Sequence, residues 1–501
     1  MGKFVSLACE DLKELRKIDP RLISYNVEMT EVTGGTFWKA YTPEQIAGTE
    51  QVPPPDFSKG MSAMHQWYDP IDTTNPRLIK LAKALGSAWV RVSGTWATKT
   101  YYDFEDTGVV PEGYQNRLTK QQWLNLLDFV KAVDGKLLIS VANCEGLHSA
   151  SEPWNPSQAE LLFKLSEEYG VPVDAVEFTN EPNMMEGTGF PKGYTPADFR
   201  RDQDLFHKWV RENYPNVIIV GPCTCDPTAL RGDDSESSGG AGIADVLTSC
   251  TTGDLMDGCT EKLDVFSYHY YNGVSERMAA MCPDMFTPAS EATSEPYLNM
   301  AGICARAFAP YRDKYCPGGD MWVTESGDAG AGGHTWASTY LEVPRELNEF
   351  ADFATVTNGV IFHNTLASSD YGYLKHGSFD PRPSYFAALL WKQLMGDTVY
   401  DSGFALSEGA HIYAHSRKDG QAGYAYLVIN NSKTDVTTVE LPKDAVRYTL
   451  DGNGNMRSPI MYLNGKALTL DENDEVPVME GTAQEAGIVE VAPGTCTFFV
   501  L

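Results

Sequence analysis

Short β-branched runs alternate with longer helical patterns from about residue 21 to residue 395, and this alternation constrains the fold more than any other feature of the chain. Repeated strand–helix units predict a parallel sheet. The candidate strands are Leu22–Glu28, Ala88–Ser93, Lys136–Ala142, Ala175–Asn180, Val217–Gly221, Leu263–Tyr270, Met321–Thr324 and Gly359–His363. The helical patterns between them are Pro76–Leu85, Gln121–Val133, Gln158–Tyr169, Pro196–Asn213 and Pro344–Phe353. Eight such units predict an α/β fold, a (β/α)8 TIM barrel, with its chemistry at the C-terminal ends of the strands.

The texture of the sequence changes after the apolar stretch Tyr385–Leu394. Short alternating runs follow, separated by turn signals such as Asp419-Gly420 and Asn464-Gly465, which is typical of an all-β module. The runs Tyr424–Ile429 and Thr495–Val500 suit the strands of a sandwich. We therefore expect a catalytic barrel over residues 21–395, a C-terminal β-sandwich over 396–501, and an N-terminal segment over 1–20 that packs on the sandwich.

Acidic residues outnumber basic ones by 68 to 39, which gives a formal net charge of −29. A field of that sign repels nucleic acid, anionic membranes and densely sulfated sugars. Hydrophobic residues make up 42% of the chain, and no stretch reaches the roughly 18 apolar residues that a membrane span needs. The composition predicts a protein with neither a nucleic-acid nor a membrane partner.

The N-terminus and the cysteines give weaker information. Met1–Cys9 contains only a short apolar run before Glu10 and Asp11, too little for a secretory signal. We therefore expect a cytoplasmic protein, with a trimmed export signal as the alternative. The 10 cysteines show no paired zinc-binding spacing. For the protein as a whole we expect neither a metal nor an organic cofactor.

Two glutamates stand where candidate strands run out into loops. Glu181 follows the fourth strand within Asn180-Glu181-Pro182, and Glu325 ends the seventh, 144 residues later (325 minus 181). An Asn-Glu-Pro segment alone suits a helix-capping loop equally well. A glycosidase, however, needs one carboxyl group that protonates the leaving oxygen and one ionised carboxylate that attacks the anomeric carbon. The pair predicts Glu181 as general acid/base and Glu325 as nucleophile.

Finer motifs carry a resemblance to a known family. Val90-Arg91-Val92-Ser93-Gly94-Thr95 and Phe379-Asp380-Pro381-Arg382-Pro383-Ser384-Tyr385, together with the Asn-Glu-Pro-Asn motif, resemble segments of the heparanase and β-glucuronidase family, glycoside hydrolase family 79. The resemblance extends over nearly the whole chain. It implies a retaining barrel glycosidase in which Asn180 bonds the sugar 2-hydroxyl, Arg91 keeps Glu325 ionised, and Tyr270 orients Glu325.

In the same family, backbone amides of a glycine-rich loop and a tyrosine hydroxyl hold the glucuronate carboxylate. The resemblance places these roles on Gly332 and Gly333 within Gly330-Ala331-Gly332-Gly333, and on Tyr373, with Tyr371 as the alternative tyrosine. Small residues let amide groups approach an anion closely.

The resemblance also assigns sugar contacts to Thr95 and to the end of the first strand. There the family often has Asp and Asn, whereas this chain has Glu28 and Thr30. The difference makes the ring specificity less certain than the mechanism.

We expect from these observations an exo-acting β-glucuronidase that removes terminal β-linked glucuronic acid, with retention, from small or weakly charged glycosides or oligosaccharides. Alternatives are a retaining β-glycosidase for a neutral sugar such as xylose, galactose or glucose, and a catalytically inactive carbohydrate-binding barrel. The sequence leaves the aglycone and the oligomeric state open.

Overall fold

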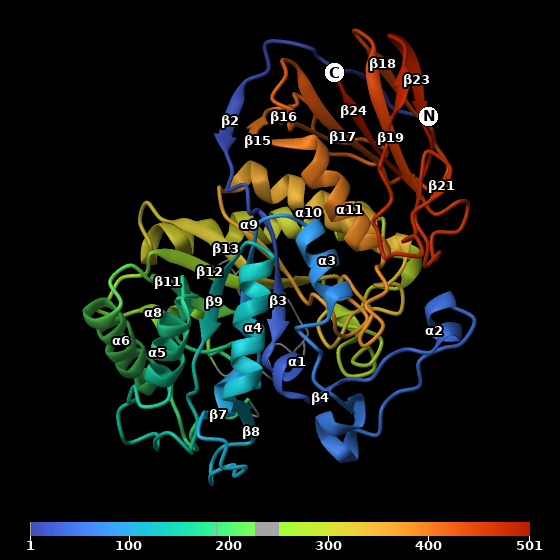
Figure 1. The fold of residues 1–501 in the computed structure, drawn as a ribbon. Coiled ribbons are helices and arrows are strands. Elements are labelled where there is room, and N and C mark those ends of the chain that lie inside the picture. Colours follow the sequence, from blue (N-terminus) through green and yellow to red (C-terminus); the bar gives the residue numbers. More distant parts are fainter. Residues whose placement is uncertain (1, 187, 226–249) are drawn as a thin grey trace.

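In the computed structural model, which describes residues 2–186, 188–225 and 250–501, parallel strands close into a barrel beneath an antiparallel β-domain (Figure 1). Among these residues the closed barrel has eight strands. They are β3 (Ile23–Glu28), β6 (Ala88–Ser93), β9 (Gly135–Ser140), β10 (Ala175–Glu177), β11 (Ile218–Thr224), β12 (Val265–Tyr271), β13 (Asp320–Gly327) and β14 (Ile361–His363). Each matches one candidate strand of the sequence, so the predicted TIM barrel is confirmed.

Alternation along these strands divides the interior into layers. Side chains near the N-terminal ends form a separate apolar cluster that fills the bottom of the barrel: Trp89, Leu138, Ala175, Val220, Val265, Trp322, Val360 and Phe362. Two residues further along β6 comes Arg91, which is fully buried among polar groups. The barrel is therefore a packed core with a polar layer above an apolar base.

Helices surround the barrel, and their apolar faces join the main hydrophobic core. Asn75 caps α3 through the Arg77 and Leu78 amides, and Thr195 and Asp198 form a capping box at α6. The longer helices are α3 (Pro76–Ala84), α4 (Lys120–Ala132), α5 (Ala159–Tyr169), α6 (Pro196–Asn213), α9 (Glu295–Tyr315), α10 (Val343–Val356) and α11 (Pro383–Leu394). No described helix is long and apolar enough to cross a lipid bilayer.

Short elements that the periodicity did not predict lie in the loops at the C-terminal face. A hairpin of β4 (Gly35–Trp38) and β5 (His65–Tyr68) follows the first barrel strand, and 3-10 helix η2 (Ala97–Lys99) follows the second. The others are α1 (Met29–Thr33), α2 (Pro43–Ala47), η1 (Phe57–Met64), β7 (Thr100–Asp103), β8 (Asn116–Thr119), α8 (Thr252–Met256), η4 (Pro283–Met285) and η5 (Ala289–Glu291). Elements of three to eight residues give too few repeats to show a hydrophobic period.

The C-terminal domain consists of two antiparallel sheets. The larger contains β15 (Met395–Tyr400), β16 (His411–Arg417), β17 (Tyr424–Asn430), β19 (Ala445–Asp451), β20 (Tyr462–Leu463), β21 (Lys466–Ala467), β22 (Thr482–Gln484) and β24 (Thr495–Val500). The smaller contains β18 (Thr437–Leu441) and β23 (Gly487–Val491). Along β17, Tyr426 and Val428 pack between the sheets, whereas Leu427 and Ile429 join the core of the barrel side. The predicted C-terminal β-sandwich is confirmed.

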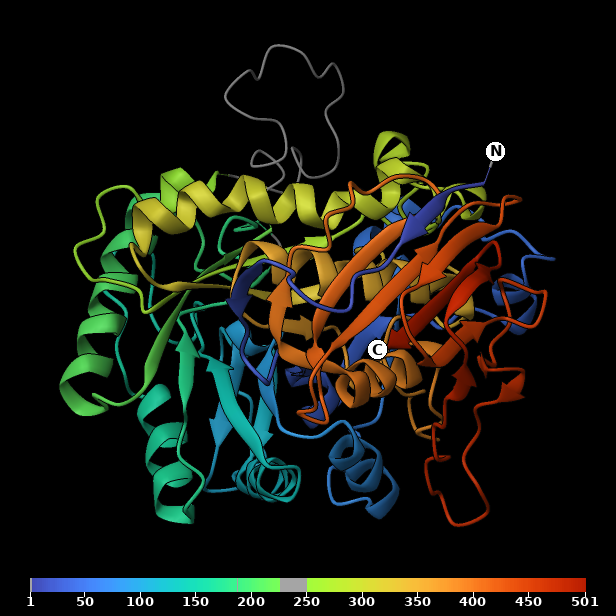
Figure 2. The same ribbon diagram turned by 90° about the horizontal axis from the view of Figure 1, so that it is seen from above.

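The N-terminal strands complete both sheets. Strand β1 (Phe4–Ser6) pairs in parallel with β18, and β2 (Glu14–Lys17) pairs antiparallel with β15. Both ends of the chain consequently lie on the sandwich (Figure 2). The boundaries at residues 20 and 395 stay predictions.

The sandwich rests on α10 and α11, and Tyr340 of 3-10 helix η6 (Tyr340–Glu342) connects the two parts (Figure 1). Its hydroxyl donates to the carbonyls of Leu450 at 2.8 Å and of Gly494 at 3.0 Å, and its amide donates to Ser458 at 2.9 Å. The Tyr340 side chain is fully buried, so water cannot replace its hydroxyl as the hydrogen-bond donor to these carbonyls.

We expect Tyr340→Phe to lower the free energy of unfolding by about 1 to 3 kcal/mol, because it leaves buried carbonyls without their donor. Urea denaturation followed by fluorescence measures the change. The matched control is Tyr462→Phe on β20, whose hydroxyl makes no hydrogen bond with the described residues. Equal small losses in both variants would contradict a structural role for the Tyr340 hydroxyl.

Candidate active site

Arg91 lies at the centre of the polar layer and contacts groups from three other strands. Its Nε donates to Glu177 at 2.8 Å, Nη1 donates to Glu325 at 3.1 Å, and Nη2 donates to Asn180 Oδ1 at 2.9 Å. Nη2 also lies 3.3 Å from Nε2 of His269. Because its guanidinium is a rigid planar fork, Arg91 fixes the relative positions of these side chains.

Glu325 faces the barrel interior because β13 contains a bulge. Tyr268 pairs with Val323 but His269 pairs with Glu325, so Thr324 is an extra residue in β13. Trp322, three residues before Glu325, also packs inside the barrel, whereas Ser326 points outward and donates to Glu349 of α10 at 2.5 Å. A bulge of this kind redirects the next side chain, here the candidate nucleophile, to the other face of the strand.

The surroundings of Glu325 favour its ionised form. Burial acts to raise the pKa of this carboxyl group, but His269, Arg91 and a hydrogen bond from Tyr271 together outweigh burial and lower the pKa. The Tyr271 hydroxyl donates to Glu325 Oε2 at 2.8 Å. A carboxylate that stays charged is what a nucleophile requires.

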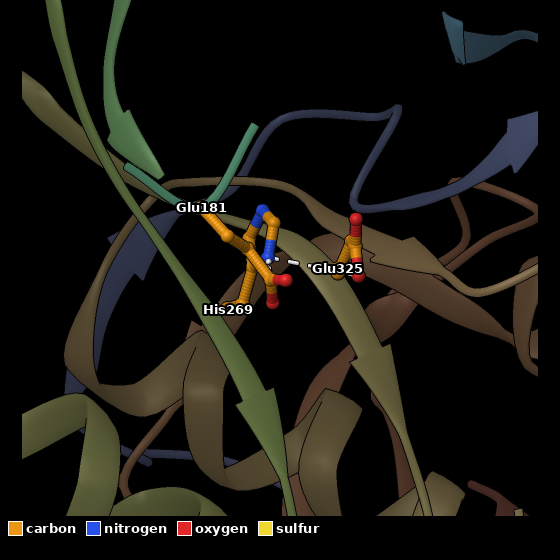
Figure 3. A group of neighbouring side chains, drawn as sticks. All are labelled: Glu181, His269 and Glu325. Atoms are coloured by element: carbon orange, nitrogen blue, oxygen red, sulfur yellow. Dashed lines mark hydrogen bonds and ion pairs between the residues drawn. The ribbon is translucent and has the colours of Figure 1, made fainter. Parts of the chain in front are cut away.

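Glu181 follows β10 with a φ of 43°, in the left-handed region that non-glycine residues rarely adopt. Such strained backbone is concentrated at functional sites. Its Oε1 lies 3.0 Å from Nδ1 of His269, and the same nitrogen lies 3.6 Å from Glu325 Oε2 (Figure 3). The three groups from β10, β12 and β13 therefore point into one space, and His269 lies between the two carboxylates.

Glu28 brings a third carboxyl group to this space. Burial and the charge of Glu325 raise its pKa well above the usual value, partly offset by Arg91. Gly94, with a φ of 89°, makes room for it, because a Cβ there would overlap the Glu28 carboxyl group. The role of Glu28 in binding a sugar hydroxyl stays a prediction.

Asn180 lies where the sequence predicted. It is 2% exposed, and its carbonyl oxygen accepts from Arg91, which leaves the amide nitrogen as its remaining donor. Thr95 lies in the turn after Gly94 and makes no hydrogen bond with the described residues. The Thr30 hydroxyl is buried without a partner among them. The roles of Asn180 and Thr95 in binding stay predictions.

The assignment of Tyr270 is corrected by the structure. Its hydroxyl donates to Asn272 Oδ1 at 2.6 Å, and its ring belongs to the core outside the barrel. Tyr271 bonds Glu325 instead. Because side chains of a strand alternate, a displacement of one residue selects the opposite face. His269 and Tyr271 point inward, so Tyr270 cannot.

The assignment of Tyr373 is also corrected. This residue is fully buried, its ring stacks on His363 at 3.7 Å, and its hydroxyl is directed toward Glu346 of α10, outside the barrel wall. Tyr371 is the tyrosine near the site. Its hydroxyl accepts from Asn364 at 3.2 Å, and burial together with the charges of Glu28 and Glu325 raises its pKa.

The glycine-rich loop lies beside Tyr371, since a Cβ on Gly333 would lie 3.1 Å from that of Tyr371. The Gly333 amide, however, already donates to Ala329 at 3.1 Å, so it is not free to bind a ligand. The Gly332 carbonyl accepts from Ser369 at 3.0 Å, and its amide has no backbone partner among the described residues. Of the two predicted amides, only that of Gly332 remains available.

Several residues of the site were missed by the sequence reasoning. Glu177, which balances Arg91, and His269 were visible in the strand segments but received no role. Tyr271 was also visible in the sequence, but its role was assigned to the neighbouring Tyr270. Asn364 donates to the hydroxyls of Tyr271 at 2.8 Å and Tyr371 at 3.2 Å, and no sequence signal marked it. Strict alternation from Ser267 inward would have identified His269 and Tyr271.

Glu181, His269 and Glu325 are residue types that also ligate metals, and their ligand atoms all lie within 4.8 Å of one another. The Arg91 guanidinium, however, contacts both Glu325 and His269. A divalent cation at this position would be repelled by that fixed positive charge. The arrangement suits acid/base and nucleophilic chemistry better than metal binding.

Comparison with known proteins gives relatives along most of the chain, although no family model matches it. The chain is 23% identical over 486 residues to heparanase-like protein 1 of Arabidopsis thaliana, covering 86% of this chain and 85% of that protein. It is 28% identical over 359 residues to baicalin-β-D-glucuronidase of Scutellaria baicalensis, covering 69% and 62%. The relatives also include inactive heparanase-2 proteins.

Among solved structures, a 4-O-α-L-rhamnosyl-β-D-glucuronidase from Fusarium oxysporum 12S superposes with a TM-score of 0.60. The two chains are 11% identical, and the alignment covers 99% of this chain and 100% of that one. This likeness shows a shared fold.

We expect Tyr271→Phe to move the acidic limb of the kcat/KM profile of an aryl β-glycoside to higher pH. The lost hydrogen bond favours ionised Glu325, so its removal raises the pKa of the group that must be charged. At neutral pH the rate constant should fall roughly tenfold or more. Tyr270→Phe is the matched control and should leave the limb in place. A shift in the control and none in Tyr271→Phe would contradict the assignment.

Proposed function

Because the chain is homologous to the heparanase and β-glucuronidase family of glycoside hydrolases, as its motifs indicated, we propose that it hydrolyses β-glycosides with retention of configuration. The observation that carries the proposal is the proximity of Glu181 and Glu325, whose nearest carboxylate oxygens lie within 4.8 Å. Retaining enzymes hold the two carboxyl groups about 5 to 5.5 Å apart, whereas inverting enzymes keep them about 6.5 to 9.5 Å apart to admit a water molecule.

In the first step, ionised Glu325 attacks the anomeric carbon and forms a glycosyl ester, while Glu181 gives its proton to the departing glycosidic oxygen. In the second step, Glu181 takes a proton from water, whose oxygen displaces Glu325 and restores the starting state. Arg91 and Tyr271 donate to Glu325 and stabilise its charged form before it attacks. The same hydrogen bonds stabilise the carboxylate when it leaves in the second step. Two displacements leave the product in the β configuration.

The proposed substrate is a terminal β-linked glucuronic acid. Tyr371 and the Gly332 amide can both donate to its carboxylate without introducing a mobile cation. Trp38 of β4 packs on Gly332, since a Cβ there would lie 2.6 Å from the tryptophan side chain, and we propose that it closes this side of the site. A closed side supports exo action on a chain end.

The net charge and one of the relatives support a small substrate. That relative is named baicalin-β-D-glucuronidase. With a net charge of −29, the chain repels long polyanions, whereas local donors suffice for a single carboxylate. We therefore propose small or weakly charged glucuronides rather than sulfated polymers.

A second candidate is a retaining β-glycosidase for a neutral sugar. The observation in its favour is the loss of two of the predicted carboxylate donors, since the Gly333 amide is bonded to Ala329 and Tyr373 lies outside the barrel. Aryl β-glycosides with and without the C5 carboxylate distinguish the two candidates. No turnover of any of them would favour an inactive binding protein.

We expect Glu325→Gln to abolish turnover of 4-nitrophenyl β-glucuronide and Glu181→Ala to be rescued by azide as β-glucuronyl azide. Azide needs no general base and enters the covalent intermediate from the β face. Proton NMR of the product identifies its anomeric configuration. An α-azide would show inversion and overturn the mechanism.

We expect Tyr371→Phe to reduce kcat/KM for the β-glucuronide roughly tenfold or more while barely changing residual β-glucoside activity, because a hydrogen bond to a charged group is worth about 1.5 to 3 kcal/mol. Tyr373→Phe is the matched control and should affect both sugars equally. Equal losses on both sugars in Tyr371→Phe would mean that this tyrosine positions the ring or the loop, and not the carboxylate.

A further inference from the structure

Lys99, the last residue of η2, is a buried lysine without an acidic partner among the described residues. It is 8% exposed, and it forms no ion pair with a carboxylate among the described residues. Lysines are almost never fully buried unless they are paired, because removing the charge from water is costly. The mechanism proposed above does not use this residue.

Neighbouring groups hold the Lys99 side chain in one position. Its Nζ lies 4.2 Å from the centre of the Trp96 ring, and that ring is fixed by a 3.0 Å hydrogen bond from Nε1 to the carbonyl of Thr36 in β4. The aliphatic part of Lys99 packs on Gly189, where a Cβ would lie 3.0 Å from Lys99 Cδ. Because the Lys99 side chain is already ordered in the folded protein, ligand binding would not lose free energy by ordering it.

Lys99 lies on the same side of the site as the acid/base residue. Thr98, its neighbour, contacts Thr179 through their hydroxyls at 3.2 Å, and Thr179 stands two residues before Glu181. Gly189 belongs to the segment that follows Glu181. The general acid must face the leaving group, so this is the side from which the leaving group departs.

Lys99 contributes positive charge near His65 although the chain as a whole is acidic. Burial lowers the pKa of His65 on β5 to about 4, and the positive charges of Arg277, Lys99 and Lys39 contribute to that shift. Arg277 is neutralised by Asp370 at 2.9 Å. Lys99 and Lys39 form no such ion pair with the described residues, so they leave positive charge near His65.

We propose that Lys99 and the Trp96 ring bind an anionic group, a carboxylate or sulfate, on the leaving group of the substrate. The fixed ammonium supplies a charge-assisted hydrogen bond, and the indole supplies a flat surface for the ring or sugar that carries the anion. One buried lysine accommodates one such group, in keeping with a weakly charged substrate. This inference rests on the proposed function for the position of the bond that is cleaved.

The test compares two 4-nitrophenyl β-glucuronides that carry either a carboxylate or a neutral carboxamide at the same ring position. The wild-type protein should have a kcat/KM about tenfold or more higher for the carboxylate. Lys99→Met keeps the packing on Trp96 and Gly189 but removes the charge, so it should abolish the preference and leave the carboxamide rate unchanged. Lys99→Arg should keep part of the preference.

The matched control is Lys192→Met, an exposed lysine on the same segment as Gly189, which should behave as the wild type. An unchanged preference in Lys99→Met, or an equal loss on both substrates, would overturn the proposal. Calorimetry with Glu325→Gln gives the same comparison without turnover. If the wild type cleaves neither glycoside, the proposed function fails. In that case, tighter binding of the carboxylate than of the carboxamide that is lost in Lys99→Met would still support the anion site. Equal binding of the two compounds would refute it.

Discussion

The buried guanidinium of Arg91 is the interaction on which the rest of the site depends. It joins Glu177 and Asn180 of the fourth barrel strand and its loop, His269 of the sixth strand and Glu325 of the seventh. Taking one partner away from a buried ion pair costs about 3 to 5 kcal/mol, so the positions of these four side chains are strongly coupled. Glu177 and Glu325 together balance the arginine and leave one carboxylate facing the substrate.

The barrel supplies this arrangement through the geometry of its strands. Two residues below Arg91 the interior is apolar, and two residues above it Ser93 meets Ser140 at 2.7 Å, so polarity increases toward the C-terminal face. The bulge at Thr324 then brings Glu325 inward. Among three neighbouring carboxyl groups, the pKa of Glu325 is lowered while burial and Glu325 itself raise that of Glu28. Environments that separate pKa values in this way let similar side chains take different roles.

Most of the fold could be predicted from the sequence because eight strand–helix periods are long, regular signals. The proximity of Glu181 and Glu325 could be predicted as well, since they follow candidate strands whose C-terminal ends meet at one face of the barrel, whereas their catalytic roles stay predictions. The role of Tyr270 was wrong because the resemblance to the family assigned it. The alternation of Ser267, His269 and Tyr271 toward the barrel interior points to Tyr271 instead. The assignment of Tyr373 was also wrong. The path of the loop after β14 depends on tertiary contacts, such as the stacking of Tyr373 on His363, that the sequence does not show. The β4–β5 hairpin and the environment of Lys99 could not be predicted, because their contacts come from loops that are far apart in the sequence.

The most direct test of the account is to identify the residue that becomes glycosylated. A 2-deoxy-2-fluoro-β-glucuronide with a good leaving group should trap the covalent intermediate, because fluorine slows both steps and the leaving group restores the first. Peptide mass spectrometry after digestion should then find the sugar on the peptide that contains Glu325, attached to that side chain. A sugar on Glu181 or Glu28, or complete turnover to α-configured product without any adduct, would contradict the account.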